Sequence, residues 1–142
     1  MLQDDHAFKR VYGWSPDGKS LLTGRLDPAT KWDVLVVPVD GSAPHTLLKS
    51  VANEVAAGYS KDGRWIKYVT DESGPYELCV LPASGQGLPY QVTIGGAGGT
   101  FWLDGRHLLR GTSKDPTTGI IPDIGGGPSL KLGAPPVLGP LP

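Results

Sequence analysis

The stretch WSPDGKSLL, residues 14–22, places an aromatic residue, a proline and an Asp-Gly pair directly before an apolar run. Because Asp-Gly tolerates the positive φ angles of a tight hairpin, the stretch predicts a turn that leads into a β-strand. The pattern returns in YSKDGRWIKYV, which begins at Tyr59, and in FWLDGRHLL, which begins at Phe101. Asp17, Asp62 and Asp104 are therefore 45 and 42 residues apart. This spacing is typical of one repeated supersecondary unit.

A second phrase follows each Asp-Gly pair. WDVLVVPVDG (32–41) and YELCVLPASG (76–85) share an aromatic residue, an acid, an apolar run around a proline and a final glycine, and GIIPDIGGG (119–127) is a weaker copy. The repeat thus contains four strands: one ending at the aromatic residue (about 9–14, 54–59 and 99–102), one after Asp-Gly, one containing the proline and one after the glycine. The proline lacks an N–H and is expected at a strand end, a bulge or an outer position.

Alternation along the strands predicts which residues share a face. In the middle copy, Ile66 and Tyr68 are expected on one face of the second strand, and Trp65, Lys67 and Val69 on the other. The proline-containing run is apolar on both faces, as expected for a strand between two neighbouring sheets. We also expect the repeated aromatic residues Trp14, Tyr59 and Phe101 to pack between sheets.

Four antiparallel strands per repeat with two apolar faces predict an all-β fold, a partial β-propeller of about three four-stranded antiparallel blades. The blades are expected at about 8–50, 54–94 and 99–132, so that the propeller covers residues 1–132. The Pro/Gly-rich segment 133–142, GAPPVLGPLP, shows no strand alternation and contains four prolines. It is expected to be an extended or disordered tail.

The phrase WSPDGK, followed by an apolar strand and then by aromatic-acid-apolar run-Gly, resembles the WD40-like PD40 repeat of TolB-like propellers over roughly residues 8–132. YSKDGR lacks the proline, and FWLDGR lacks both the serine and the proline. The resemblance implies a non-catalytic propeller segment that serves as a protein-interaction or sensor scaffold. Two alternatives within larger bacterial proteins are the sensor region of a Ser/Thr kinase or regulator and the gating domain of a prolyl-oligopeptidase-like serine peptidase.

Three blades are fewer than the four to eight that close a propeller. An open arc would expose a blade face at each end, and burying such a face of a few hundred Å² is worth several kcal/mol at roughly 25 cal/mol per Å². We therefore expect either that this sequence is a fragment of a longer propeller or that copies associate to cover the faces. A twofold pairing of such arcs would give six blades.

Composition excludes several classes of partner. With 142 residues and a formal net charge of −1, the chain has no general attraction for nucleic acid or an anionic membrane. The amino end, MLQDDHAFKR, has no apolar core, and no segment reaches membrane-spanning length. As written, the sequence predicts a soluble, unexported cytoplasmic chain; a periplasmic location would apply if it is a fragment of a TolB-like protein.

The sequence predicts no catalytic, cofactor or metal site. The three repeated Asp residues belong to separate turns, where they are expected to accept backbone N–H bonds. The three histidines follow no metal-binding spacing, and Cys79, within an apolar run, is expected to be a buried inert thiol. There is no G-x-S-x-G elbow, and a strand pattern instead of a helix follows the glycines of GGAGGT (95–100).

A partner is expected at one end of the blades. In an up-and-down blade, the loops between the second and third strands share an end with the connections between blades. Here these loops are longer and charged: LDPATK (26–31), DESG (71–74) and SKDPTT (113–118). Because binding tends to reside on longer loops of a rigid scaffold, the predicted partner-binding residues are Asp27, Lys31, Asp71, Glu72, Lys114 and Asp115.

Overall fold

The computed structural model describes residues 7–93, 96–102, 108–111 and 120–121, and these residues form three antiparallel sheets without a helix. The first sheet holds β1 (Lys9–Trp14), β2 (Ser20–Asp27), β3 (Lys31–Pro38) and β4 (His45–Leu48). The second holds β5 (Glu54–Tyr59), β6 (Trp65–Thr70), β7 (Glu77–Pro82) and β8 (Tyr90–Gln91). The third holds β9 (Gly99–Trp102), β10 (Leu108–Gly111) and β11 (Ile120–Ile121). No helix that could cross a membrane occurs in these ranges.

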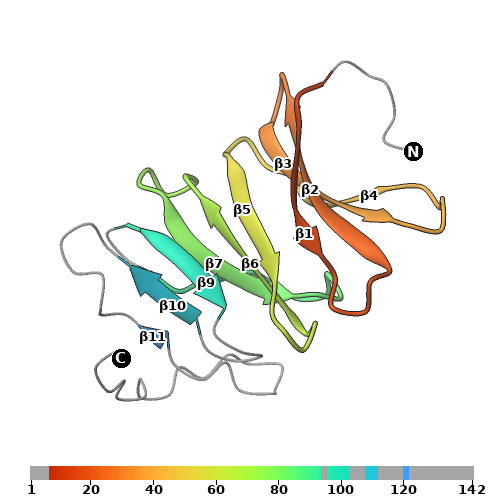
Figure 1. The fold of residues 1–142 in the computed structure, drawn as a ribbon. Helices are drawn as coiled ribbons and strands as arrows, with labels where there is room; N and C mark the ends of the chain where they lie inside the picture. Colours follow the sequence, from red (N-terminus) through yellow and green to blue (C-terminus); the bar gives the residue numbers. More distant parts are fainter. Residues whose placement is uncertain (1–6, 94–95, 103–107, 112–119, 122–142) are drawn as a thin grey trace.

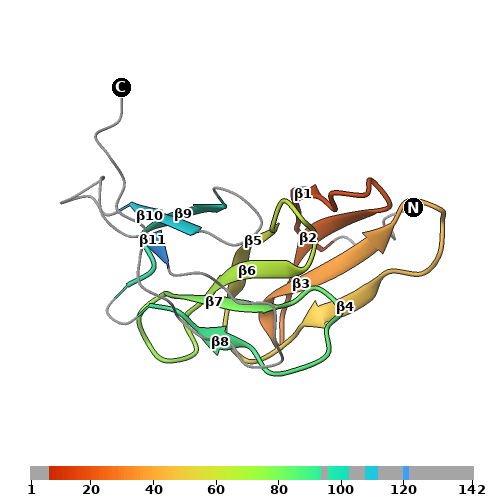
Figure 2. The ribbon, with the colours of Figure 1, turned by 90° about the horizontal axis from the view of Figure 1, so that it is seen from below.

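The strands of each sheet are hydrogen-bonded in chain order, so that each sheet is a meander. The second sheet lies between the first and the third (Figure 1). Seen from below, β1 and β5 lie at one edge of their sheets, and β4 and β8 at the opposite edge (Figure 2). The predicted fourth strand of the last repeat and the predicted tail lie outside the described residues.

The Asp-Gly turns form as the sequence predicts, with Gly18 at φ 70° and Gly63 at φ 75°. A serine that precedes each Asp completes the turn. Ser60 Oγ donates to Asp62 Oδ1 at 2.6 Å and accepts the Trp65 N–H at 3.0 Å. The first turn has the same pair of bonds around the Ser15 hydroxyl, at 2.6 and 2.9 Å. Both Asp side chains therefore have a structural role, because each is held within its own turn. Asp104 lies outside the described residues.

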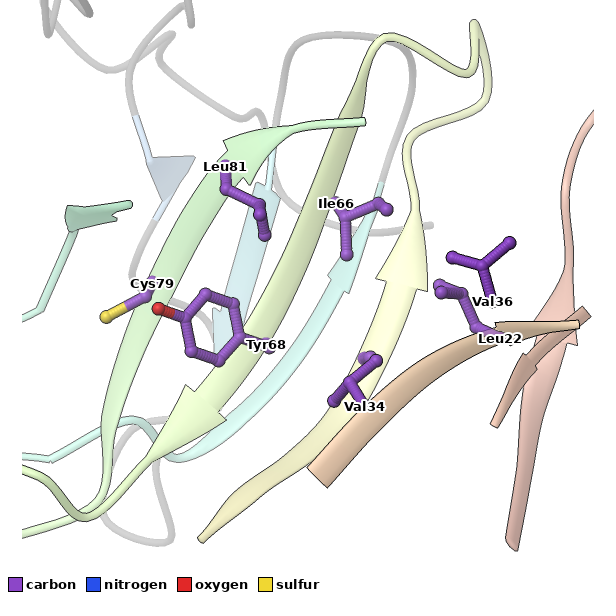
Figure 3. Close-up of a cluster of buried hydrophobic side chains, with 8 residues drawn as sticks. Leu22, Val34, Val36, Ile66, Tyr68, Cys79 and Leu81 are labelled. Carbon is purple, nitrogen blue, oxygen red and sulfur yellow. The ribbon is translucent and has the colours of Figure 1, made fainter. Parts of the chain in front are cut away.

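Two apolar clusters join the three sheets. Between the first and second sheets, Leu22, Val34 and Val36 pack in one cluster with side chains of β6 and β7, namely Ile66, Tyr68, Cys79 and Leu81 (Figure 3). The opposite face of the second sheet contributes Trp65, Val69, Leu78 and Val80 to a cluster with Ala97 and Leu108. The predicted division of β6 into two apolar faces is confirmed, and β7 is buried on both faces. Pro38 and Pro82 end β3 and β7, also as predicted.

Two of the three predicted packing aromatics are exposed instead. Trp14 is 60% exposed, and it pairs with Leu21, on the face of the first sheet that points away from the second. Tyr59, 45 residues later, pairs with Ile66 and packs against the cluster shared with the first sheet. Trp14 thus occupies the equivalent position on a face that no other sheet of the described residues covers. The prediction was right for Tyr59 and wrong for Trp14.

Phe101 is 67% exposed for a different reason. The repeat spacing would pair Phe101 with Leu108, as Tyr59 pairs with Ile66, but Phe101 pairs with Leu109 and Trp102 pairs with Leu108. A register difference of one residue reverses the side chains of a strand. Trp102 consequently packs against the second sheet and donates from Nε1 to the Gly58 carbonyl at 2.9 Å. Trp102 has taken the role predicted for Phe101.

Candidate functional site

The predicted partner-binding residues lie on loops that the structure ties together at one end of the sheets. Asp27 ends β2, Lys31 begins β3, and Asp71 and Glu72 follow β6. Asp71 accepts the Asn53 backbone N–H at 2.7 Å and the Asn53 side-chain N–H at 2.8 Å. Since Asn53 lies in the connection between the first two sheets, this pair joins a loop within the second sheet to that connection. Lys114 and Asp115 lie outside the described residues.

Charges of both signs meet at this end, which we call the loop rim, comprising Asp27, Lys31, Lys49, Asp71 and Glu72. Lys49 Nζ lies 3.8 Å from Asp27 and 3.9 Å from Asp33. The two Asn53 bonds lower the pKa of Asp71, and the Lys31 ammonium adds to that effect. Lys31 and Glu72 are exposed. The loop rim therefore carries charges of both signs, next to apolar surface from residues such as Phe8.

Sequence reasoning missed three buried carboxylates behind the rim. Asp33 and Glu77 are the acids of the two aromatic-acid phrases, and Glu54 begins β5; they are only 2%, 3% and 3% exposed. Glu77 accepts the Thr93 hydroxyl and the Gly96 N–H, so it fastens the chain that leaves the second sheet. The sequence could have indicated Asp33 and Glu77, because an acid stands directly before the apolar run in both copies of the repeat. A charge that recurs at the edge of the core requires a polar partner.

Asp33 and Glu54 accept fewer hydrogen bonds than Glu77, which accepts one at each carboxylate oxygen. Among the described residues, Asp33 Oδ1 and Glu54 Oε2 are buried without a hydrogen-bond partner, although Thr30 and Ser50 donate to the other oxygen of each. Burial raises the pKa of both carboxyls, and the charge of Asp33 raises that of Glu54 further. These two groups oppose folding when they are ionised.

We expect Glu54→Gln to raise the melting temperature at pH 7 by about 2–5 °C. A carboxyl whose pKa is raised on folding contributes stability below its unfolded pKa of about 4.3 and loses it as the pH rises through the folded pKa. The advantage of the glutamine should therefore shrink as the pH falls toward 4, in thermal melts followed by circular dichroism. The matched change at the exposed Glu72, Glu72→Gln, should show no such trend; an equal effect of both would contradict burial as the cause.

A second candidate site is a groove of about 550 Å³ along the first strands of the three sheets. Its lining combines apolar and aromatic residues with one amine, that of Lys67. The lining residues include Tyr12, Ala56, Lys67, Thr100, Phe101 and Trp102. Metal chemistry has no support within the described ranges, where no three His, Cys, Asp or Glu side chains gather. Cys79 is buried as predicted, and burial raises the pKa of its thiol.

Comparison with solved structures identifies the architecture. A protein assigned as TolB from Agrobacterium tumefaciens matches 71% of this chain at 24% identity with a TM-score of 0.60. TolB from Acinetobacter baumannii matches 75% of this chain at 16% identity with a TM-score of 0.62. The fold is that of a TolB-like β-propeller. The three sheets are thus successive blades, which confirms the predicted fold class.

The likeness concerns the fold alone at these identities. The matched region spans 37% and 27% of the two TolB chains, so this chain covers about a third of the length of these relatives. No protein-family model matches the sequence. No curated protein matches it either.

Proposed function

We propose that the chain is a non-catalytic propeller scaffold that binds protein surfaces, in the manner of a TolB-like segment. The observation that carries this proposal is the difference between the blade faces. The second blade is covered by apolar side chains on both sides, whereas Trp14 on the first blade and Phe101 on the third are exposed on faces turned away from it.

The outward face of the first blade supports an apolar partner. Its strands alternate so that Trp14, Leu21 and Val37 share that face. Val11 pairs with Thr23, which follows Leu22 in β2 and therefore points away from the second blade. Val11 thus lies on the same outward face, where it is largely exposed. An apolar sheet surface in a propeller is complementary to the face of another blade. The partner proposed for this face is therefore a further blade, from a longer polypeptide or from a second copy.

The loop rim supports a different kind of contact. Its exposed charges, on Lys31 and Glu72, stand on turns held by Asp27 and Asp71. Such charged loops on a rigid scaffold favour a polar partner whose association depends on salt. Together with Lys114 and Asp115, these residues remain our proposed partner-binding set.

Light scattering on the purified chain tests the proposal. We expect a mass of at least twice the 14.9 kDa of one chain, or a monomer that binds an apolar dye such as ANS. Trp14→Lys should reduce the association or the dye signal several-fold. Leu88→Lys changes an exposed apolar residue in the β7–β8 loop and should have no effect. A folded monomer that binds no dye would contradict the proposal.

A further inference from the structure

Lys67 occupies an unusual place for a lysine, in the middle of a buried strand. It pairs with Gly58 and lies on the face of β6 that carries Trp65 and Val69, toward the third blade. Its Nζ donates to the Ala56 carbonyl at 3.1 Å and to Thr100 Oγ1 at 3.3 Å. Both acceptors are neutral. No ion pair with a carboxylate is formed by Lys67 within the described part of the chain.

The backbone of β5 shapes the position of this amine. The β5–β6 register shifts between Val55 and Gly58. The extended backbone of β5 is interrupted at Ala56, which has φ 53°. A bulge of this kind redirects the groups of one strand, and a left-handed non-glycine residue is uncommon. The consequence is that the Ala56 carbonyl, which β6 does not pair, receives the Lys67 amine.

The groove gives the amine an aromatic surrounding. Tyr12 comes from the first blade and Trp102 from the third, so that two aromatic residues line the groove with Lys67, whereas the Phe101 side chain is turned away from the second blade. Trp102 is held in place by its bond to the Gly58 carbonyl. Lys67 is partly exposed, which leaves it accessible to a small molecule in the groove.

The charge state of the amine follows from this surrounding. Burial lowers the pKa of Lys67 to about 8, because removal from water penalises the ammonium, and no carboxylate of the described residues pairs with it. At pH 7.5 roughly a quarter of the molecules then carry a neutral amine, against about one in a thousand for an ordinary lysine of pKa about 10.4. A neutral amine in an apolar groove is a nucleophile toward carbonyl carbon.

We propose that Lys67 forms a reversible imine with an aldehyde whose aromatic or apolar body lies in this groove. The Nζ lone pair adds to the carbonyl carbon, the C=O π pair moves to oxygen, and a proton passes from nitrogen to oxygen to give a carbinolamine. Loss of water, which carries away the former carbonyl oxygen and the two amine hydrogens, gives the C=N bond. The Thr100 hydroxyl, 3.3 Å from Nζ, is placed to pass the proton. This activity is separate from the scaffold role.

The lining distinguishes an aldehyde from an anionic ligand. Lys67 is the only cationic side chain among the described residues that line the groove, so a carboxylate or phosphate would have a single charged partner. The aromatic residues Tyr12 and Trp102 and the alanine and valine residues of the lining instead favour a flat apolar body. An aromatic aldehyde therefore fits the groove better than carbon dioxide or formaldehyde, which have no such body.

Reductive trapping on the intact chain tests the proposal. The protein is incubated with benzaldehyde from pH 6 to 10, treated with borohydride, and each lysine is scored by peptide mass spectrometry. We expect at least a tenfold higher labelling rate at Lys67 than at the exposed Lys61 at pH 7.5, with a half-maximal rate near pH 8. With formaldehyde the preference for Lys67 should fall several-fold.

Variants separate the amine from general reactivity. Lys67→Met should abolish the fast label, whereas Lys61→Met should leave it unchanged, with folding checked by circular dichroism. The peptide-level comparison within the wild-type chain needs no variant, so it holds even if Lys67→Met does not fold. Equal labelling of Lys67 and Lys61, or a Lys67 profile that rises only near pH 10, would overturn the proposal.

Discussion

Replacing Ile66 by alanine is expected to lower the free energy of unfolding by about 2–5 kcal/mol. Ile66 is fully buried in the cluster between the first and second blades, where Leu22 and Val34 lie opposite (Figure 3). Alanine would leave a cavity at the contact that joins the two sheets, and close-packed interiors relax only partly into such a space. Urea denaturation followed by tryptophan fluorescence measures the loss.

The matched control is Val51→Ala, because Val51 is 77% exposed in the connection between the same two blades. Its effect should stay within about 0.5 kcal/mol. A loss of less than about 1 kcal/mol for Ile66→Ala would show that the blades do not pack through this cluster, since truncating a buried Ile normally costs more.

Much of this packing was predictable from the sequence because the strand period is two. Ile66 and Tyr68 alternate with Trp65 and Val69, and the sheet must place the two sets on opposite faces. The Asp-Gly turns fixed where the strands begin, and the proline phrases fixed where β3 and β7 end. These features are local, and the repetition of each about 45 residues later made them distinguishable from chance.

Pairing register and neighbours were not predictable in the same way. Trp14 and Tyr59 have the same local sequence context, yet among the described residues only Tyr59 packs against a neighbouring blade. Phe101 is exposed because β9 pairs one residue out of step with the repeat, so that Trp102 turns inward. Neither outcome can be derived from composition or spacing, because both depend on which surface lies opposite.

The two candidate sites differ in the same way: local sequence predicts the loop rim, whereas the groove depends on how the blades pack. The charged loops between strands allowed the loop rim to be predicted from the sequence. The structure adds the contact between Asp71 and Asn53, which is 18 residues away. The groove escaped sequence reasoning, because Lys67 meets Thr100, 33 residues away, only after two blades have packed. A lysine in an alternating strand is normally read as solvent-facing. Its burial follows from the approach of the third blade.

Replacing Gly63 by valine is expected to destabilise the second blade by about 1–3 kcal/mol. Gly63 has φ 75°, a left-handed conformation that a β-branched residue strongly disfavours. Hydrogen bonds hold the turn in this conformation, because the Gly63 N–H donates to the Ser60 carbonyl at 2.9 Å and Ser60 Oγ donates to Asp62; a Cβ here would lie 3.6 Å from the Pro16 ring, an ordinary contact distance. The loss should appear as a lower midpoint in urea with an unchanged slope.

Gly63→Asn separates backbone strain from the loss of a small side chain. Asparagine adopts the left-handed conformation far more readily than valine, so its loss should be clearly smaller, although both residues add a Cβ near Pro16. Equal losses for the two variants would assign the effect to contact with Pro16. An unchanged midpoint for Gly63→Val would mean that the Asp62-Gly63 turn does not hold the conformation on which the repeat of WSPDGK and YSKDGR depends.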